Sequence, residues 1–576
     1  MFGNPYIFVS TDEKRIVDAF GFLQSTDLEP RYADAQRNTY LFARAKQDFP
    51  CYLSVINDQG DYSIREDVQR ALEKQVCSRE TDSLVSFAHV DQNRFVAKTD
   101  LWGIQHHYYY HKGRTFICSN NCLLIAKLVD ARFDEESLFD YLFFLSPNGD
   151  RSWFEGVRLL RPDQAIVYDI ASGSFSVTEE TDLYNEMTVK PSVDLVDAMS
   201  SLYEKASAVL RKARTLMSLS AGSDSRTVLS GLLGSGMDVD IVSFGGENFL
   251  ETRNIRALAK ARGLAPKIYD FADLLSNWTE TFHSASLVTN GLLNPFRVHY
   301  GNYYRSLEGD ALFEGFVGSE FVKGEIAVGA AASECHVAVI RDGLDVGQAI
   351  ERTLGFLPDA YRSRMQEYII ERYRGVLQPV ESSGGKKEFA RQMLESVPGR
   401  VFNPLHALAC ARLKLYMPFL SRRVLRAVFQ SYGVVHYNSL RRDFPGTVKC
   451  LIPECLIVKH FDQRLYRSRL DRRVTFAEAL ELPLFVSDSL RRSRVLLEKL
   501  TVRGLHRGQV DAALLAAAAE RFLRENSATL EDGFPWGRIE GKHLLSKRCN
   551  LICLKQLMMM DLKQMVDTLL NMSTHR

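Results

Sequence analysis

The stretch from Leu216 to Leu233 constrains the fold of this chain more than any other part of the sequence. Apolar and small residues lead into a loop of Ser, Ala, Gly and Ser, a helix-favouring run follows, and Gly234-Ser235-Gly236 ends that run. This order predicts a strand, a loop and a helix. Because the first backbone amides of a helix lack partners and small side chains let oxyanions approach, such a loop is typical of a phosphate site.

The loop also carries polar side chains of two kinds. Ser220, Ser223 and Ser225 supply hydroxyl donors, whereas Asp224 places a carboxylate where it would repel a bound polyphosphate. A divalent cation resolves that conflict, because Mg²⁺ takes one or two carboxylates together with phosphate oxygens. We therefore interpret Asp224 as a metal ligand of a nucleotide site. The alternative is a helix N-terminus that is merely capped by Asp and Ser side chains.

This segment resembles the S-G-G-x-D-S pyrophosphate loop of the asparagine synthetase family, with Ala221 at the place of the first glycine. It lacks the Gly-Lys-Ser/Thr ending of a Walker A loop. The resemblance implies cleavage of ATP between the α and β phosphates, adenylylation of a carboxylate, and attack by ammonia or an amine. It also implies that ATP is bound by the loop residues Leu219, Ser220, Ala221, Gly222, Ser223 and Ser225.

Composition indicates an ordinary globular protein. The 576 residues suggest roughly two to four domains, and 46% of them are hydrophobic and 25% charged. The net charge of +1 gives no global attraction to nucleic acid or to a membrane. There is no apolar run of the roughly eighteen residues that a spanning helix needs, and no signal-peptide pattern at the N-terminus. We expect a cytoplasmic protein with reduced cysteines and no nucleic-acid or membrane partner.

Short β segments dominate the first part of the chain, and several of them alternate apolar with polar residues. Three further segments, Asp100–Tyr110, Glu136–Phe144 and Trp153–Gln164, resemble in the same order the glutaminase domain of asparagine synthetases. Residues 1–185 are therefore expected to form a class II glutamine amidotransferase-like domain, an N-terminal-nucleophile (Ntn) β-sandwich. The expected strands are Tyr6–Ser10, Tyr52–Ile56, Leu84–Ala88, Arg94–Lys98 and Ala165–Asp169.

This expected domain lacks the nucleophile of the glutaminase domains that it resembles. Glutaminases of this type use an N-terminal cysteine, but residue 2 is Phe2 and the first cysteine is Cys51, within a strand-like run. We predict that the domain is degenerate and does not hydrolyse glutamine. His106 and His107 are interpreted as strand residues whose side chains point to opposite faces and cannot share one site.

The second part of the chain has an α/β pattern. Strand-like runs at Val239–Phe244 and Pro266–Asp270 flank a helical run at Glu251–Arg262, which predicts a parallel sheet with crossover helices. Ligands of such sheets bind at the carboxyl ends of the strands. The resemblance implies that Ser243 and Phe244 contact adenine there through their backbone. We expect residues 186–576 to form a pyrophosphate-loop ATPase domain with C-terminal helices.

A second motif lies at residues 311–324 and resembles the family's L-x-G-E-G-x-D-E-x-x-G-G segment. Gly315, Glu320 and Gly324 agree with it, whereas Phe316 and Ser319 stand where its two other acids belong. Ser319 stands at the place of the motif's aspartate, which in the family normally helps to hold the metal. Glu320 is therefore the candidate substitute, as an oxygen ligand with a catalytic role. The alternative for Glu320 is a solvated helix start.

One or two lysines complete the candidate site. The stretch around Lys449 resembles the family's lead toward its active-site lysine, so Lys449 or Lys459 is a candidate phosphate-side cation. Either is more often a surface lysine.

The leading hypothesis is an ATP- and Mg²⁺-dependent amide ligase that joins a small-molecule or peptide carboxylate to ammonia or an amine. Variants of it are ring closure as in lasso-peptide cyclases or β-lactam synthetases. The rival is a nucleotide-binding but inactive scaffold, suggested by Phe2, Phe316 and Ser319 together. The acid, the amine and the oligomeric state stay open, with a homodimer kept as one option.

Overall fold

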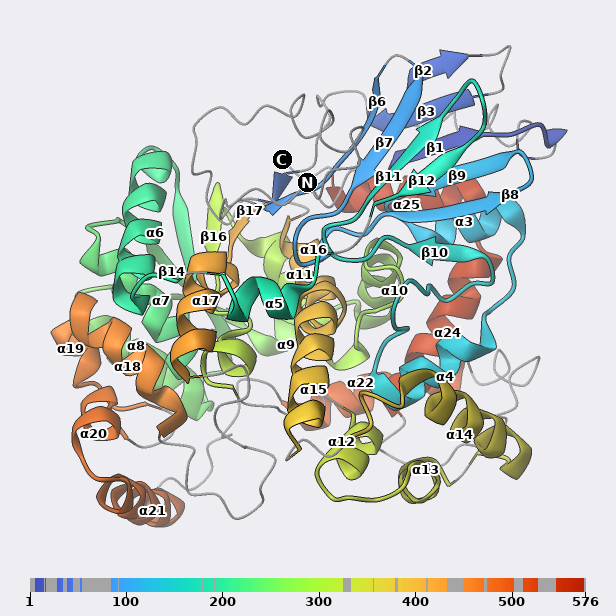
Figure 1. The fold of residues 1–576 in the computed structure, drawn as a ribbon. Helices are drawn as coiled ribbons and strands as arrows, with labels where there is room; N and C mark the ends of the chain where they lie inside the picture. The colour runs from blue at the N-terminus through green and yellow to red at the C-terminus, as the bar shows by residue number, and fades with distance from the viewer. Residues whose placement is uncertain are drawn as a thin grey trace.

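The computed structural model describes residues 6–14, 16, 28–34, 39–44, 52–53, 84–91, 93–178, 181–190, 192–324, 333–355, 357–378, 382–410, 413–432, 449–470, 474–501, 511–526 and 545–573. Within them the strands form two large antiparallel sheets, one parallel sheet and a two-stranded pair. The antiparallel sheets precede the parallel sheet in the chain (Figure 1). The mixed α/β class predicted from the sequence is confirmed.

The first part of the described chain is rich in strands. Its elements are β1 (Tyr6–Ser10), β2 (Leu28–Asp34), β3 (Thr39–Arg44), β4 (Tyr52–Leu53), β5 (Leu84–Val85), β6 (Phe87–Asp91), β7 (Arg94–Lys98), β8 (Tyr108–Lys112), β9 (Thr115–Ser119), α3 (Cys122–Val129), α4 (Glu135–Phe144), β10 (Val157–Leu159), β11 (Ala165–Asp169), β12 (Phe175–Val177) and α5 (Leu183–Thr188).

The remaining part alternates strands with helices and then becomes helical. Its first elements are α6 (Leu195–Leu210), β13 (Thr215–Ser218), α7 (Ser223–Gly234), β14 (Asp240–Gly245), α8 (Leu250–Ala261), β15 (Lys267–Asp270), α9 (Phe271–Leu274), α10 (Trp278–Val288), η1 (Pro295–Arg297), α11 (His299–Ser306), β16 (Ala311–Phe313) and η2 (Gly318–Val322). The later elements are α12 (Glu334–Ile340), α13 (Val346–Leu354), α14 (Asp359–Tyr373), α15 (Ser383–Ser396), η3 (Val397–Val401), α16 (Asn403–Cys410), β17 (Lys414–Tyr416), η4 (Pro418–Leu420), α17 (Arg422–Tyr432), η6 (Lys449–Leu451), α18 (Ile452–Phe461), α19 (Gln463–Tyr466), α20 (Phe476–Glu481), α21 (Leu484–Thr501), α22 (Ala512–Glu525), α24 (Leu545–Met559) and α25 (Leu562–Ser573).

The two antiparallel sheets pack face to face. Their strand orders are β10-β8-β9-β1-β3-β2 and β12-β11-β7-β6. Stacked aromatic rings join them. The ring centroids of Phe8 in β1 and Phe95 in β7 are 4.1 Å apart, and those of Phe116 in β9 and Tyr168 in β11 are 4.3 Å apart. Neighbouring residues of β1 face the other way, toward the core that includes α3. Because β1 is buried on both faces, its residues from Tyr6 to Val9 are all apolar or aromatic and do not alternate with polar ones.

The parallel sheet has the order β15-β14-β13-β16-β17. All four pairings are parallel, with Met217 opposite Ile241 on one side of β13 and opposite Phe313 on the other. In chain order its strands therefore run third, second, first, fourth and fifth. The order reverses between β13 and β16, and in open parallel sheets ligands bind outside the carboxyl ends of strands at such a reversal.

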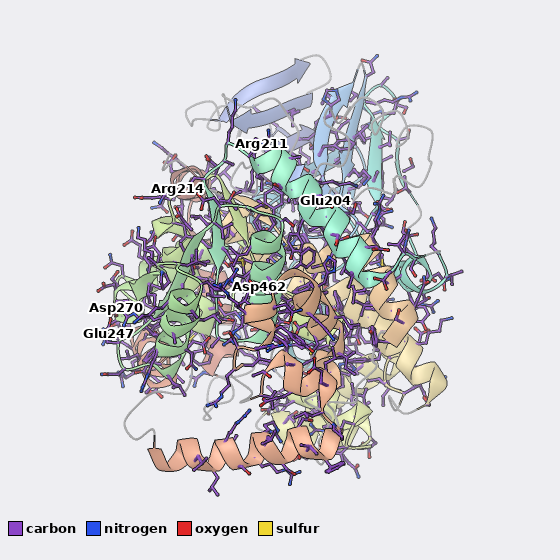
Figure 2. The ribbon with its side chains drawn as sticks, turned by 90° about the vertical axis from the view of Figure 1, so that its left-hand side faces the viewer. Glu204, Arg211, Arg214, Glu247, Asp270 and Asp462 are labelled. Atoms are coloured by element: carbon purple, nitrogen blue, oxygen red, sulfur yellow. The ribbon has the colours of Figure 1, made fainter. Side chains whose placement is uncertain are left out.

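Helix α7 packs beside this sheet, and α6 and α18 lie close against it. A Cβ atom at Gly231 would lie 1.9 Å from the Tyr203 ring of α6, and one at Gly234 would lie 2.8 Å from the Phe461 ring of α18. The two glycines therefore set how near α7 comes to both neighbours. Figure 2 labels Glu204 on α6, Arg211 just after it, and Asp462, which follows α18. Asp462 is buried and pairs with Arg262 at 2.9 Å.

Most of the strands and helices expected from the sequence lie within one or two residues of their predicted bounds. The expected strand Leu84–Ala88 is instead divided at Ser86 into β5 and β6, which belong to different sheets, and residues 54–56 of the expected strand Tyr52–Ile56 lie outside the described residues. The interpretation of His106 and His107 is also wrong, because they precede β8 and are not strand residues. Both are buried, and His106 contacts Gly399 O whereas His107 contacts Tyr6 and Ser86, so they do not share a site. Phe2 and Cys51 lie outside the described residues.

Among the described helices, none combines the length and the apolar character that crossing a membrane would require.

Candidate functional site

The predicted phosphate loop lies at the carboxyl end of β13, beside the reversal of strand order. Leu219 N donates to Val242 O (2.9 Å), so the extended ladder continues until the loop begins. Gly222 is the N-cap of α7 and Ser223 begins the helix. None of residues 219–222 has a positive φ, and the Ala221 methyl group is buried. Alanine therefore fits at this position without backbone strain.

Two of the three serine hydroxyls are used inside the loop. Ser225 Oγ accepts a hydrogen bond from Ser220 N (3.0 Å) and lies 2.9 Å from Ser220 Oγ. Gly222 N donates to Ser220 Oγ at 3.2 Å. These contacts close the loop on itself, so Ser220 and Ser225 shape the site before any ligand arrives.

The first amides of α7 are the loop's open donors. Among the described residues, no acceptor bonds the amides of Ser223 and Asp224, and α7 has no side-chain cap. One residue earlier, Ala221 N donates to the carboxylate of Glu251, which enters from the first turn of α8. A carboxylate bonded to a loop amide demonstrates that this end of α7 accepts negatively charged oxygen.

The turn after β16 closes over Asp224 because two of its residues are glycines. A Cβ atom at Gly318 would lie 2.3 Å from Asp224 Oδ1, and one at Gly315 would lie 2.9 Å from Ser225 N. Between them Val317 has a φ of 60°, a left-handed conformation that β-branched residues rarely adopt. Such backbone costs about 1–3 kcal/mol and is concentrated at functional sites. The π-helix η2 follows immediately.

Asp224 is held by two side chains of the second motif. Ser319 Oγ donates to Asp224 Oδ2 at 3.0 Å, and Lys323 Nζ lies 3.1 Å from the same oxygen. Lys323 also donates to Ser223 Oγ at 3.0 Å and is only 2% exposed. Lys323 stands where the related motif has a glycine and was not predicted as a site residue. Its ammonium supplies a positive charge at the carboxylate for which a metal ion was expected.

Glu454 is a second residue that sequence reasoning missed. It lies on α18, is completely buried, and faces Asp224, Ser223 and Lys323. No described residue forms a hydrogen bond of regular geometry with Asp224 Oδ1 or with the carboxyl oxygens of Glu454, while Asp224 and Ser223 lie close enough to Glu454 to hydrogen-bond it. Burial first, and then the neighbouring Asp224 charge, raise the pKa of Glu454 well above its usual value. Two carboxyl groups in this arrangement need a shared proton or a cation.

Two further carboxyl groups line the same region. Burial raises the pKa of Glu320 to about 7, with a contribution from Asp224. Burial also raises the pKa of Glu314 to about 8, while Tyr304 donates to both of its oxygens at 3.1 Å. Glu320 is 5% exposed and so is not a solvated residue. The site is therefore strongly acidic, with Lys323 as a buried cation within it.

The remaining predicted residues lie at different places. Ser243 and Phe244 end β14 in the buried interior, and Phe244 packs against the rings of His299, Tyr300 and Tyr303. Lys449 begins η6, but its side chain lies outside the described part of the structure. Lys459 is half exposed, 3.8 Å from Glu481, as expected of a surface lysine.

The oxygen atoms present fit a magnesium ion in part. Asp224 and Glu454 offer the hard oxygen atoms of two adjacent carboxyl groups, and Mg²⁺ uses one or two carboxylates with phosphate and water oxygens. Within the described ranges, no three or more His, Cys, Asp and Glu residues are arranged to hold a metal by themselves. A metal here would need oxygens from a ligand.

Comparison with models of protein families and with curated proteins gives no match to this chain.

Proposed function

We propose that this chain is an ATP-dependent, AMP-forming amide-bond ligase whose nucleotide site is the loop at residues 219–225. The observation that carries the proposal is the pair of adjacent carboxyl groups of Asp224 and Glu454, next to helix amides without acceptors among the described residues. A polyphosphate with Mg²⁺ matches both, because the metal satisfies carboxyl oxygens and the amides satisfy phosphate oxygens.

Each group of the chain has a role in this proposal. Asp224 and Glu454 would hold Mg²⁺, which when bound offsets the negative charge of the phosphates. The amides of Ser223 and Asp224 orient the phosphate oxygens, and the Lys323 ammonium fixes Ser223 and Asp224 relative to each other. Since Lys323 and Glu454 are buried and Asp224 is only 22% exposed, the charge interactions among them are stronger than at the surface. The backbone at Ser243 and Phe244 would contact adenine.

The amide-forming step rests on the resemblance to the asparagine synthetase family. The substrates would be a small-molecule or peptide carboxylate, activated by adenylylation, and ammonia or an amine from outside the protein. Ring closure within one substrate, as in lasso-peptide cyclases or β-lactam synthetases, is the same chemistry. Residues 1–185 would be a degenerate Ntn-type amidotransferase-like domain, and residues 186–576 the pyrophosphate-loop synthetase domain.

Calorimetric titration of ATP with and without Mg²⁺ tests the site. We expect Mg²⁺-dependent binding to the wild type, and binding at least about tenfold weaker in Asp224→Asn, since a charged metal contact is lost. Asp240→Asn is the matched control, because Asp240 is an exposed carboxylate at the opposite end of the sheet that pairs with Arg214. Equal binding by both variants and the wild type would contradict the proposed site.

A nucleotide-binding scaffold without catalysis is the second candidate. Two contacts favour it: Lys323 already occupies Asp224 Oδ2, and Glu251 already occupies the Ala221 amide. Exchange of labelled pyrophosphate into ATP in the presence of candidate acids separates the two functions. A ligase exchanges label with its own acid, whereas a scaffold binds nucleotide and exchanges none.

A further inference from the structure

A second polar cavity lies away from the loop, where the β-rich first part of the chain meets helices α14 and α15. It has a volume of about 260 Å³. The first part contributes the segments at Asn148–Gly149 and at 159–162, and the second part contributes the end of α14, one face of α15 and Arg400 of η3. Its size suits a molecule of several heavy atoms.

The cavity has more donors than acceptors. Arg400 is 8% exposed and donates to the carbonyl oxygens of Pro147, Gly149 and Arg151, with no carboxylate partner among the described residues. Arg372, also on the wall, forms no ion pair with another described residue. The buried amide nitrogen of the Asn148 side chain has no acceptor.

The acidic residues of the cavity are already neutralised. Glu395 pairs with Arg161 at 2.7 Å, and Glu388 pairs with Arg391 at 2.8 Å. Neither Arg372 nor Arg400 forms an ion pair with a described carboxylate, and only Arg400 interacts at longer range with the Asp140 carboxyl group, so the cavity keeps a net positive charge. One acceptor is open as well, because Gln392 Oε1, on the α15 face between Glu388 and Glu395, is buried without a donor.

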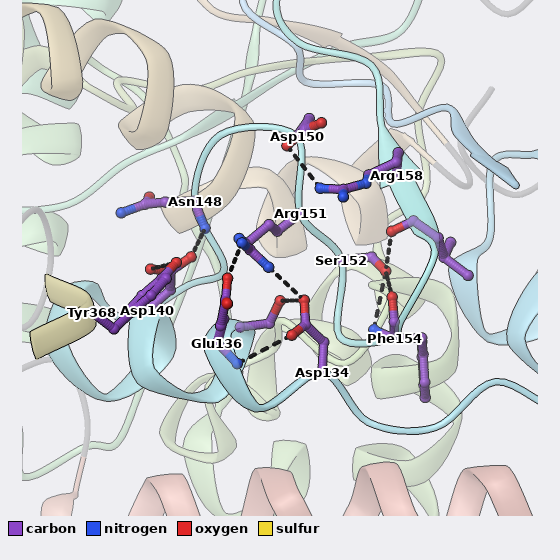
Figure 3. A network of polar contacts seen from close by, with 12 residues as sticks. Asp134, Glu136, Asp140, Asn148, Asp150, Arg151, Ser152, Phe154, Arg158 and Tyr368 are labelled. Carbon is purple, nitrogen blue, oxygen red and sulfur yellow. Dashed lines mark hydrogen bonds and ion pairs between the residues drawn. The ribbon is translucent and has the colours of Figure 1, made fainter. Parts of the chain in front are cut away.

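The wall that carries Asn148 is rigidly supported (Figure 3). Asp140 accepts from the Asn148 backbone amide at 3.0 Å and from the Tyr373 and Tyr368 hydroxyls at 2.7 and 3.1 Å. Arg151 extends the network to Asp134 at 2.8 Å. Asp140 thus ties the backbone of Asn148 to tyrosines from the other part of the chain. The unpaired Asn148 side chain is therefore held in place before a ligand binds.

We propose that this cavity binds a small organic acid that carries a carboxylate next to a hydroxyl or amine donor. The carboxylate satisfies Arg372, Arg400 and the Asn148 side-chain amide, and the donor satisfies Gln392 Oε1. Guanidinium groups suit carboxylates because they offer paired N–H donors in one plane. The ligand would contact both parts of the chain, so its binding strengthens their junction.

Calorimetry with L-malate, succinate and inorganic phosphate on the full chain tests the site. L-malate has both features, succinate lacks the hydroxyl donor, and phosphate lacks the carbon skeleton. We expect binding in the order L-malate, succinate, phosphate, with a rise in melting temperature on L-malate binding. Absence of binding by all three at millimolar concentration, or tightest binding by phosphate, overturns the proposal.

Two variants locate the binding. Asn148→Asp puts a negative charge against the ligand's carboxylate, and Arg372→Gln removes an exposed cation without disturbing the fold; each should weaken L-malate binding at least about tenfold. Arg364→Gln, on the same helix but paired with Glu135 outside the cavity, is the control that should leave binding unchanged. ATP binding should be equal in all three variants. If Arg372→Gln and Arg364→Gln bind L-malate alike, the acid does not occupy this cavity.

Discussion

The loop site and the junction cavity differ in the ionisable side chains that line them. At the loop, the carboxyl groups of Asp224, Glu454 and Glu320 lie around Lys323, so carboxyl groups outnumber cations. At the junction, Arg372 and Arg400 form no ion pair with a described carboxylate and the Asn148 amide has no acceptor, so donors are in excess. Since buried polar groups are normally paired, the buried Asn148 amide at the junction and the adjacent carboxyl groups at the loop each indicate a ligand.

The two regions also differ in how they are built. Parallel strands and the helix that follows β13 bring the loop residues together, and glycines at 315 and 318 allow the turn to touch Asp224. The junction cavity instead forms where two parts of the chain meet, and loops and helix ends line it. Removing one charge should therefore destabilise the loop site more than the junction.

The largest effect is expected for Lys323→Met. Removal of one partner of a buried ion pair leaves an uncompensated charge, so we expect a loss of about 3–5 kcal/mol in the free energy of unfolding. Urea denaturation measures it. The double variant Asp224→Asn with Lys323→Met should recover part of the loss. If the single variant is as stable as the wild type, Lys323 is not the counter-charge of Asp224.

Gly318→Ala should have a smaller but specific effect. Its Cβ would lie 2.3 Å from Asp224 Oδ1, so the turn or the carboxylate must shift. We expect about 1–3 kcal/mol of destabilisation and at least tenfold weaker binding of ATP with Mg²⁺. Gly384→Ala is the control, because a Cβ there meets nothing within 4 Å. Both variants can be compared by calorimetry, and equal nucleotide affinities would count against close contact at Asp224.

The acidic excess at the loop should make stability depend on pH. Because the pKa of Glu314 rises from 4.5 to about 8, the folded state keeps a proton that the unfolded chain loses. Stability from this group is complete below pH 4.5 and declines as the pH rises to about 8. Glu314→Gln can still accept from Tyr304 and should flatten that decline in denaturation at several pH values. An unchanged slope would mean that Glu314 is ionised in the folded protein.

The smallest effect is expected at the junction. Arg161 and Glu395 form a pair whose side chains are 29% and 40% exposed, so solvent screens their attraction. Glu395→Gln should lower the free energy of unfolding by less than about 1 kcal/mol. A loss as large as that of Lys323→Met would remove the contrast between the two regions.

Local sequence patterns predicted much of the fold. The run from Leu216 to Leu233 gave a strand, a loop and a helix, and alternating or continuous apolar runs located β1, β7, β11, β14 and β15. These patterns work because side-chain periodicity and turn chemistry act over a few residues. His106 and His107 were misjudged because an apolar and aromatic run looks strand-like even where it forms a buried loop.

The candidate site was predicted only in part. Asp224 and the glycine at 315 were found from their motifs, but Lys323 and Glu454, although they lie within stretches that resemble the family, do not match a functional position of its motifs. The hydroxyls of Ser220 and Ser225 bond within the loop, and the sequence did not predict these contacts. A buried charge at the end of an acidic motif would have been the available signal for Lys323.

The amino-acid sequence contains, in its local spacing, the strand-loop-helix unit with Asp224 and the glycines that permit close approach. It does not contain the distances between segments far apart in the chain. Lys323 meets Asp224 because strand order places β16 beside β13, and Glu454 meets it because α18 packs on α7. Charge interactions depend on those distances and on burial, and both exist only once the chain has folded.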